Sequence, residues 1–433
     1  MNTKTAMAVL DKQSGIAILS PQDRLTNLKD ATVIFDGTIY SPTPSASDTE
    51  IITEKLQQED HFKSSKAFLK EVEGDFAFVI AAQKRIIAGR DPIGVQPLYY
   101  GENKTVAALA SNRKALRKLG IEEALSFPPG HLALVNRDGF KFKPVKTLLY
   151  SEPKQVTMQE ASETLQELLE QAVRVRVSDA SDVAVAFSGG LDSSVVAFLA
   201  KKCQVNVHLV HVSLENQPET EEARKAADAL GLPLQVYLFG EEDVERVIPK
   251  VVQLIEEADP IKASIGVPFY WAAEKTALSG LKVMLAGQGA DELFGGYQRY
   301  VDEYMLHGEE TVRKTMFSDV VRIHESNLER DMKICGFHGV ELRVPFGSYQ
   351  IAEFAISLPT ELKIERRTDT LRKLVLRKAA KNMGLPTSVT EKTKKAVQYS
   401  TGINNTLKKI AKKQKTSLSE YIKKLYLNQT TQN

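Results

Sequence analysis

The sequence predicts two folds in succession: an α+β domain over residues 1–150, and an α/β domain with a doubly wound parallel sheet over residues 158–405. Up to residue 150, short apolar runs alternate with turn residues, and only one or two helical patterns interrupt them. From Met158 onward, strand patterns alternate with helical ones, which indicates parallel strands joined by helical crossovers. Residues 406–433 are expected to form a basic C-terminal tail.

In the first domain, the apolar runs that predict strands are residues 15–19, 31–35, 76–81, 85–88, 97–100, 105–111 and 131–135. The clearest helical pattern covers residues 49–57, and residues 143–157 are the expected linker. In the second domain, helices are expected from residue 158, after the Ser188 segment, and over residues 219–230 and 242–257. Strands are expected over residues 183–187, 205–214, 234–239 and 283–286, and the chain after Tyr297 is expected to be mostly helical.

The amino-acid composition is that of an ordinary globular protein. Its 433 residues are 42% apolar and 26% charged, which is enough for two or three domains. The net charge of +2 gives no overall signal for nucleic acid or membrane. Two cysteines make no disulfide framework, and no segment reaches the ~18 uninterrupted apolar residues of a membrane span. The N-terminus also lacks the apolar core of a signal peptide, so we expect a cytoplasmic location.

A glycine-rich segment, SGGLDSS at residues 188–194 and here called the Ser188 loop, separates an expected strand from an expected helix. Its glycines allow a tight turn and close approach of a ligand, and the first turn of the helix directs unpaired N–H groups at an anion. Hydroxyl donors beside a carboxylate favour a polyphosphate with a divalent cation held by Asp192. The structural alternative is a serine-capped turn. The candidate binding residues are Ser188, Gly189, Gly190, Asp192, Ser193 and Ser194.

A second glycine-rich segment, GQGADELFGGY at residues 287–297 and here called the Gly287 loop, follows another expected strand. In a parallel sheet it opens at the same edge as the Ser188 loop. Glu292 stands where a dinucleotide fingerprint needs its third glycine, which excludes that interpretation. Mg²⁺ usually takes one or two carboxylates plus phosphate oxygens and water, so we expect Asp291, with Glu292 as a further candidate, to complete a site with Asp192. A capped helix start is the structural alternative.

These two loops, with IEEADP at residues 255–260 and GVELRVPF at residues 339–346, resemble the synthetase domain of the asparagine synthetase family of ATP pyrophosphatases. In the first domain, GRDPIGVQPLYY at residues 89–100 and SDTE at residues 47–50 resemble that family's glutaminase-like domain. The resemblance implies an Ntn-type sandwich for the first domain and ATP-pyrophosphatase topology for the second.

The resemblance implies an enzyme that uses ATP and Mg²⁺ to join ammonia to a carboxylate, with aspartate as the expected substrate. An acyl-adenylate would form with loss of pyrophosphate, and the catalytic task would be positioning and charge neutralisation. Asp192 and Asp291 would hold magnesium, and Gly287 and Gln288 would contact the ligand. The remaining roles fall on Lys395 or Lys394 for the phosphates, Val207 and Val236 for adenine, Glu257 and Glu341 for proton transfer, and Asp259 or Glu292 for the charged groups of the amino-acid substrate.

Several positions depart from the family, among them Asn2, Asp36, Ala286, Gln288 and Gly347-Ser348. Asn2 replaces the nucleophilic cysteine of the glutamine-hydrolysing members, and Asp36 replaces the asparagine that helps to hold their oxyanion. The domain also begins late, which suggests that its first strands are absent. Glutamine hydrolysis is therefore not expected, although a misassigned start codon would give the same appearance. In the synthetase domain, Gln288 replaces a glutamate, which leaves the identity of the substrates open.

Several functions remain open beside the amide synthetase. A lactam- or peptide-forming cyclase would use an amine within its own substrate, which would explain both Gln288 and the inactive glutaminase. An RNA-modifying ATP pyrophosphatase would use the lysine-rich tail for phosphate contacts. A regulatory homologue would not catalyse at all. We expect small-molecule substrates rather than nucleic acid or a membrane, and leave a homodimer open.

Overall fold

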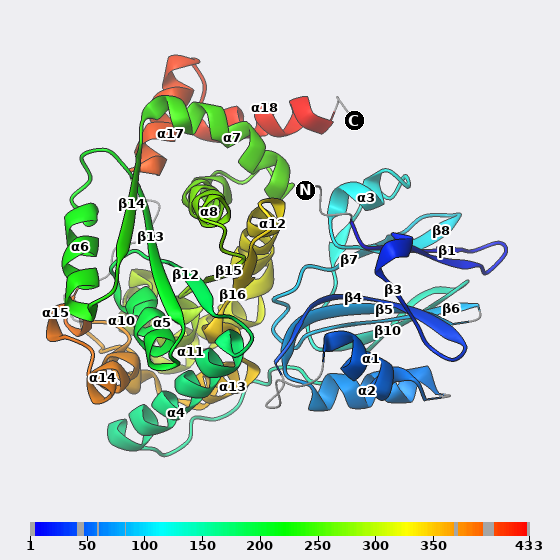
Figure 1. The fold of residues 1–433 in the computed structure, drawn as a ribbon, viewed down its shortest axis with the longest axis horizontal. Helices are drawn as coiled ribbons and strands as arrows, with labels where there is room; N and C mark the ends of the chain where they lie inside the picture. The colour runs from blue at the N-terminus through cyan, green and yellow to red at the C-terminus, as the bar shows by residue number, and fades with distance from the viewer. Residues whose placement is uncertain are drawn as a thin grey trace. The chain divides into compact units, whose positions relative to one another are not determined.

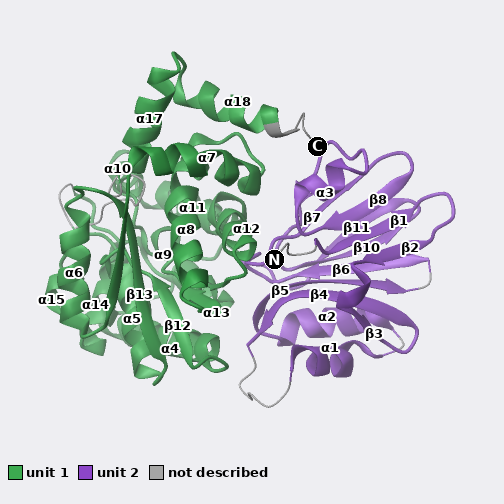
Figure 2. Ribbon diagram, turned by 45° about the horizontal axis from the view of Figure 1, so that its top comes forward, with its two compact units in different colours: residues 1, 149–433 green, residues 2–148 purple. Residues whose placement is uncertain are grey.

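The structure is a computed structural model that describes residues 5–40, 47–58, 60–82, 84–367, 371–392 and 402–430. The chain divides into two compact units, residues 2–148 and residues 149–433 (Figure 2). The division falls inside the segment that the sequence suggested as a linker.

The N-terminal unit contains two antiparallel sheets. One has the order β2 (Ala17–Ser20), β1 (Met7–Asp11), β8 (Val106–Ala110), β7 (Tyr99–Glu102), β9 (Leu125–Ser126). The other has the order β11 (Gly139–Pro144), β10 (His131–Asn136), β6 (Arg85–Arg90), β5 (Gly74–Ala82), β4 (Ala31–Ile39), β3 (Leu25–Asn27). One apolar cluster joins side chains of both sheets, among them Leu10, Leu109, Ile34 and Val79, so the sheets pack face to face.

Helices cover the outer faces of these two sheets. Helices α1 (Asp48–Leu56) and α2 (His61–Glu71) pack on the six-stranded sheet, and the short α3 (Arg113–Arg117) packs on the other (Figure 1). Strand β5 is therefore buried on both sides, which explains its nearly continuous apolar sequence. Strand β1, which the sequence did not predict, lies inside its sheet between β2 and β8.

The C-terminal unit is built on one parallel sheet, as the sequence predicted. Its order is β14 (Leu234–Phe239), β13 (Asn206–Leu214), β12 (Asp182–Ala186), β15 (Val283–Leu285), β16 (Glu341–Arg343). The chain moves outward from β12 through β13 to β14, then returns to the other side of β12 with β15 and β16. Strand order reverses between β12 and β15, and this is where sheets of this kind bind ligands.

Two groups of helices cover this sheet (Figure 1). One group is α4 (Met158–Val177), α5 (Leu191–Lys202) and α6 (Glu219–Leu230), and the other is α7 (Glu241–Ile255), α8 (Pro260–Leu278) and α12 (Glu329–Phe337). The other α-helices of this unit among the described residues are α9 (Ala290–Phe294), α10 (Gln298–His307), α11 (Glu309–Val321), α13 (Tyr349–Ser357), α14 (Leu374–Met383), α15 (Thr387–Thr390), α17 (Ile403–Lys413) and α18 (Leu418–Thr430). Among the described residues after Tyr297, β16 departs from the expected helical character, and it is too short to give a periodic signal.

The segment expected as a basic tail is a helical part of the C-terminal unit. Helices α17 and α18 pack against α7 and α8, and Leu407, Ile410 and Ile422 are fully buried. Lysines occupy positions between these apolar residues, such as the exposed Lys408 and Lys409. Composition alone marks such an amphipathic helix as a charged tail, because in α17 the lysines are as numerous as the buried residues. Among the helices that the structure describes, none has the length and apolar character needed to cross a membrane.

Candidate functional site

The Ser188 loop and the Gly287 loop meet at the carboxyl edge of the parallel sheet. The Ser188 loop leaves β12 and opens α5, whereas the Gly287 loop leaves the neighbouring β15 and opens α9. A Cβ atom on Gly287 would lie 2.8 Å from the carbonyl carbon of Asp192, so only glycine allows the two loops to approach this closely. Gly189 has a φ of +67°, which also favours glycine.

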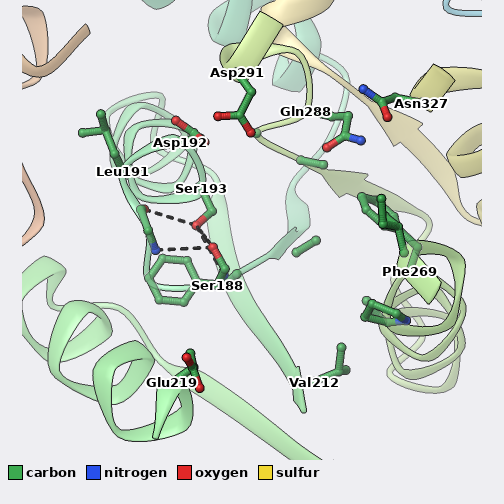
Figure 3. Close-up of a pocket in the computed structure, with 18 of the residues that line it drawn as sticks. Ser188, Leu191, Asp192, Ser193, Val212, Glu219, Phe269, Gln288, Asp291 and Asn327 are labelled. Atoms are coloured by element: carbon green, nitrogen blue, oxygen red, sulfur yellow. Dashed lines mark hydrogen bonds between the residues drawn. The ribbon is translucent and has the colours of Figure 1, made fainter. Parts of the chain in front are cut away.

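Hydrogen bonds hold the Ser188 loop in a compact turn (Figure 3). The hydroxyls of Ser188 and Ser193 lie 3.2 Å apart, and the N–H groups of Ser188 and Gly190 each donate to one of these hydroxyls at 3.3 Å. Gly190 caps α5 and provides no side chain, so the first N–H groups of that helix have no side-chain cap from it. This arrangement suits a phosphate group. Ser194 is fully buried and does not line the cavity described below.

Asp192 and Asp291 come together on one ammonium group, that of Lys373. Its Nζ lies 2.6 Å from both carboxylate oxygens of Asp192 and 2.7 Å from Oδ1 of Asp291. The Lys373 side chain is only 2% exposed. The sequence predicted that these two carboxylates would lie close together, but it gave no sign of Lys373, which is distant from both in the chain.

The two carboxylates fit the modest protein contribution that magnesium needs. Within the described residues, no group of three or more His, Cys, Asp or Glu side chains could hold a metal ion. Two carboxylates that both reach one cation are the protein ligands expected for Mg²⁺, which fills its other coordination positions with phosphate oxygens and water. Asp192 and Asp291 would therefore hold Mg²⁺ if a polyphosphate is bound beside them.

Both loops line a cavity of about 580 Å³. Basic groups outnumber acidic ones around it, which suits a ligand with several negative charges. The basic residues that line it are Lys262, Arg299, Arg330, Arg372, Lys373, Arg377 and Lys392, and the acidic ones are Asp192, Glu219, Glu222, Asp259 and Asp291.

One side of the cavity is apolar. Val210 and Val212 from β13, with Pro268 and Phe269 from α8, line it. Figure 3 shows Val212 and Phe269 away from Asp291. The strand positions suggested for adenine, Val207 and Val236, do not line the cavity. The segment of β13 that faces it lies nearer the carboxyl end of the strand than the sequence suggested.

Gln288 makes a hydrogen bond that the sequence did not reveal. Its Nε2 donates to Oδ2 of Asp331 at 3.0 Å, and the fully buried Asp331 also accepts from Arg330 at 2.7 and 3.0 Å. Burial raises the pKa of Asp331, while Arg330 and Gln288 favour its charged form. A glutamate at position 288 would set a second carboxylate against Asp331. The neutral amide therefore matches its surroundings.

Two acidic residues suggested for substrate recognition have structural partners. Glu292 is buried and accepts from the Tyr297 hydroxyl at 2.5 Å and from Nδ2 of Asn327 at 2.7 Å. Burial and the Glu292 carboxylate raise the pKa of Tyr297, so its hydroxyl remains a donor. Asp259 lines the cavity, but one of its oxygens caps α8 by accepting from the N–H groups of Ile261 and Lys262.

Neither residue suggested for proton transfer lines the cavity. Glu257 pairs with Lys262, whose side chain does line it. Glu341 accepts from Nε of Arg343 at 2.7 Å. The Arg343 guanidinium, only 2% exposed, also binds Asp179 and lowers the pKa of that carboxyl group.

Lys394 and Lys395, suggested for the phosphates, lie outside the described residues. From the same basic run, Lys392 lines the cavity, and its Nζ lies 3.2 Å from the carbonyl oxygen of Gly189 and 2.9 Å from Glu222.

In the N-terminal unit, the family-like motifs support the fold. Ser47 and Glu50 form a capping box at the start of α1. Asp91 accepts hydrogen bonds from four successive backbone N–H groups, those of residues 93–96, while the buried Arg90 donates to the carbonyl oxygens of Gly94, Gln96 and Phe127. Asp36 pairs with Arg24 at 2.9 Å, which offsets its charge. Asn2 lies outside the described residues.

A parallel sheet with two glycine-rich loops and paired carboxylates at its switch point defines the class as an α/β protein, and comparison with known proteins identifies the family. The asparagine synthase family model matches residues 164–310 and 302–432, and a glutamine amidotransferase domain model matches residues 22–118. The chain belongs to the asparagine synthetase family.

Similar curated proteins include a putative glutamine-hydrolysing asparagine synthetase of Methanocaldococcus jannaschii, 33% identical over 85% of this chain and 75% of that protein. Two asparagine synthetases of Arabidopsis thaliana are 30% identical over 86% and 92% of this chain, which spans 66% and 70% of their lengths. Among solved structures, an NMN synthetase from Francisella tularensis matches 55% of this chain and 75% of its own, with 11% identity and a TM-score of 0.29, too low to bear on fold or function.

Proposed function

We propose that this chain is an ATP-dependent amide synthetase that adenylates a carboxylate, with aspartate as its substrate, and then joins it to ammonia. One observation supports this above the others. The Ser188 loop and the Asp192–Asp291 pair meet at the switch point of the parallel sheet, in a chain that belongs to the asparagine synthetase family. The products would be asparagine, AMP and pyrophosphate.

The first step activates the carboxylate. Direct attack by ammonia on a free carboxylate would have to expel an oxide ion, which is a very poor leaving group. A substrate oxygen attacks the α-phosphorus of ATP, the bond to the bridging oxygen breaks, and pyrophosphate leaves with that electron pair. The Ser188 loop, the start of α5 and the basic residues around the cavity would bind the departing pyrophosphate. Magnesium, held by Asp192 and Asp291, would neutralise phosphate charge when bound.

The apolar side of the cavity would receive adenine between Val212 and Phe269. This sets the α-phosphorus beside the two glycine-rich loops and leaves the region around Gln288 for the carboxylate substrate. Positioning then supplies much of the rate enhancement, because the reacting oxygen and phosphorus are held in one cavity.

In the second step, the ammonia nitrogen attacks the acyl carbon, AMP leaves, and the nitrogen loses a proton. Glu257 remains the proposed acid–base group, and because it does not itself line the cavity it would act through its ion-pair partner Lys262, which does. Glu341 is proposed to orient Arg343 instead, since it lies outside the cavity in that ion pair.

Ammonia rather than glutamine is the proposed nitrogen source for the sequence as given. The curated relatives above carry the description glutamine-hydrolysing, whereas residues 1–148 of this chain contain no cysteine to serve as nucleophile. By resemblance of the motif, Asp36, which pairs with Arg24, would replace the family's oxyanion asparagine, and a carboxylate there would oppose a developing negative charge.

Pyrophosphate release from ATP and Mg²⁺ tests the proposal, measured with and without aspartate, ammonia, glutamine and tRNA. We expect aspartate to stimulate release and ammonia, but not glutamine, to complete amide formation. Asp192→Asn should reduce release at least a hundredfold, while Asp302→Asn on the exposed side of α10 should not change it. Stimulation by tRNA alone, or no release with any substrate, would contradict the proposal.

A cyclase that uses an amine within its own substrate is the second candidate. The neutral Gln288, fixed by Asp331 inside the cavity, is the observation that favours it, because the family has a carboxylate there. Pyrophosphate release stimulated by an amino-bearing carboxylate other than aspartate, with no need for ammonia, would select this alternative.

A further inference from the structure

Lys373 lies where two carboxylates would otherwise repel each other. Its ammonium bridges Asp192 and Asp291 at 2.6 and 2.7 Å. All three residues line the cavity, and the lysine side chain is almost completely buried. Burying an ammonium costs free energy unless carboxylates pair with it, and two carboxylates this close repel each other unless a cation lies between them. Each side of the arrangement therefore stabilises the other.

The backbone at Lys373 and at Gly296 has features that this contact between Lys373 and the two carboxylates requires. Lys373 has φ of 60° and ψ of 46°, a left-handed conformation that a lysine adopts at an energetic cost. A Cβ atom at Gly296 would lie 1.7 Å from Oδ1 of Asp291 and 2.4 Å from Cε of Lys373. Only glycine leaves room for the ammonium beside Asp291. Strain at one end of the contact and a required glycine at the other indicate a specific site.

The ammonium holds the carboxylates at the point where a magnesium ion would bind. Two carboxylates and one ammonium leave a single net negative charge. A divalent ion entering alone must therefore displace a tethered cation and leave that cation buried without its partners. If ATP enters at the same time, its phosphate oxygens offer the ammonium new acceptors in the same cavity.

We propose that Lys373 substitutes for the divalent cation in the nucleotide-free protein, so that the metal binds only together with ATP. This inference rests on the proposed function for the identity of the nucleotide. The consequence is a positive coupling between metal and nucleotide, and the coupling is reciprocal, because each ligand raises the affinity for the other by the same factor. The carboxylates meanwhile keep their positions without a metal.

Manganese titration of the full chain, followed by electron paramagnetic resonance, tests this with and without α,β-methylene-ATP. We expect weak Mn²⁺ binding by the unmodified protein alone, and at least tenfold tighter binding when the nucleotide analogue is present. In Lys373→Met, we expect Mn²⁺ to bind without nucleotide at least tenfold more tightly than to the unmodified protein. Adding Asp192→Asn to that variant should abolish the gain.

Lys381→Met is the matched control, because Lys381 lies on α14 in an exposed pair with Glu391, away from the cavity. It should bind Mn²⁺ like the unmodified protein. Equal Mn²⁺ affinity in the unmodified protein and Lys373→Met would overturn the inference. If Lys373→Met does not fold, the unmodified protein still decides, because Mn²⁺ affinity that does not change with the analogue also overturns it. These binding results do not depend on turnover, so a failure of the amide synthetase proposal would appear separately, in pyrophosphate release.

Discussion

At the scale of single residues, two of the departures from the family, Gln288 and Asp36, each have a partner that suits their charge. Gln288 donates to the buried Asp331, and Arg24 pairs with Asp36. In both places, the residue that differs from the family has a hydrogen-bond or ion-pair partner that suits its charge. A residue that differs from its family can therefore mark a local rearrangement of charges and need not mark decay.

Gln288→Glu tests that view. The new carboxylate would face Asp331, whose pKa burial already raises, so we expect a loss of about 1–3 kcal/mol in the free energy of unfolding, seen as a lower thermal midpoint. Combining it with Asp331→Asn should recover part of the loss, because the introduced carboxylate could then pair with Arg330. Gln253→Glu on α7 is the control, since its new charge would face Lys250. An equal loss in both single variants would contradict this account.

At the scale of elements, close contact between the two loops depends on Gly287. We expect Gly287→Ala to push the Ser188 loop out of position and to lower pyrophosphate release at least tenfold, because its Cβ would lie 2.8 Å from Asp192 backbone. Gly336→Ala in α12 is the control, since a Cβ there meets nothing within 4 Å, and it should leave the rate unchanged. Full activity in Gly287→Ala would show that the loops tolerate a wider separation.

The elements that the sequence predicted well are those with local signals. Helix α6 and strand β14 have the predicted bounds, and both glycine loops follow their strands as expected. Helix α2 was missed because it buries small polar residues such as Ser64 and Ser65 against the sheet, which blurs its apolar period. Lys373 and Asp331 were missed for another reason. Their partners are distant in the chain, and only the tertiary fold brings them together.

At the scale of the whole chain, the C-terminal helices complete the second unit. Leu407→Ala should lower the stability of that unit by about 2–5 kcal/mol, because Leu407 is fully buried where α17 meets its neighbours. The neighbouring Lys408→Ala removes an exposed side chain and should change stability by less than about 0.5 kcal/mol. Calorimetry of both variants measures this. Equal midpoints would mean that α17 is a tail after all.

The Arg90–Asp91 turn of the N-terminal unit has a consequence for how such chains are recognised. Its ionic groups are bound mainly by main-chain atoms, so the turn stabilises the fold of the unit whether or not the unit has a nucleophile. A genome survey that identifies glutaminases by the sequence motif of this turn would therefore detect the fold and not the glutaminase activity. The nucleophile, which distinguishes active glutaminases from inactive domains of the same fold, lies elsewhere in the chain.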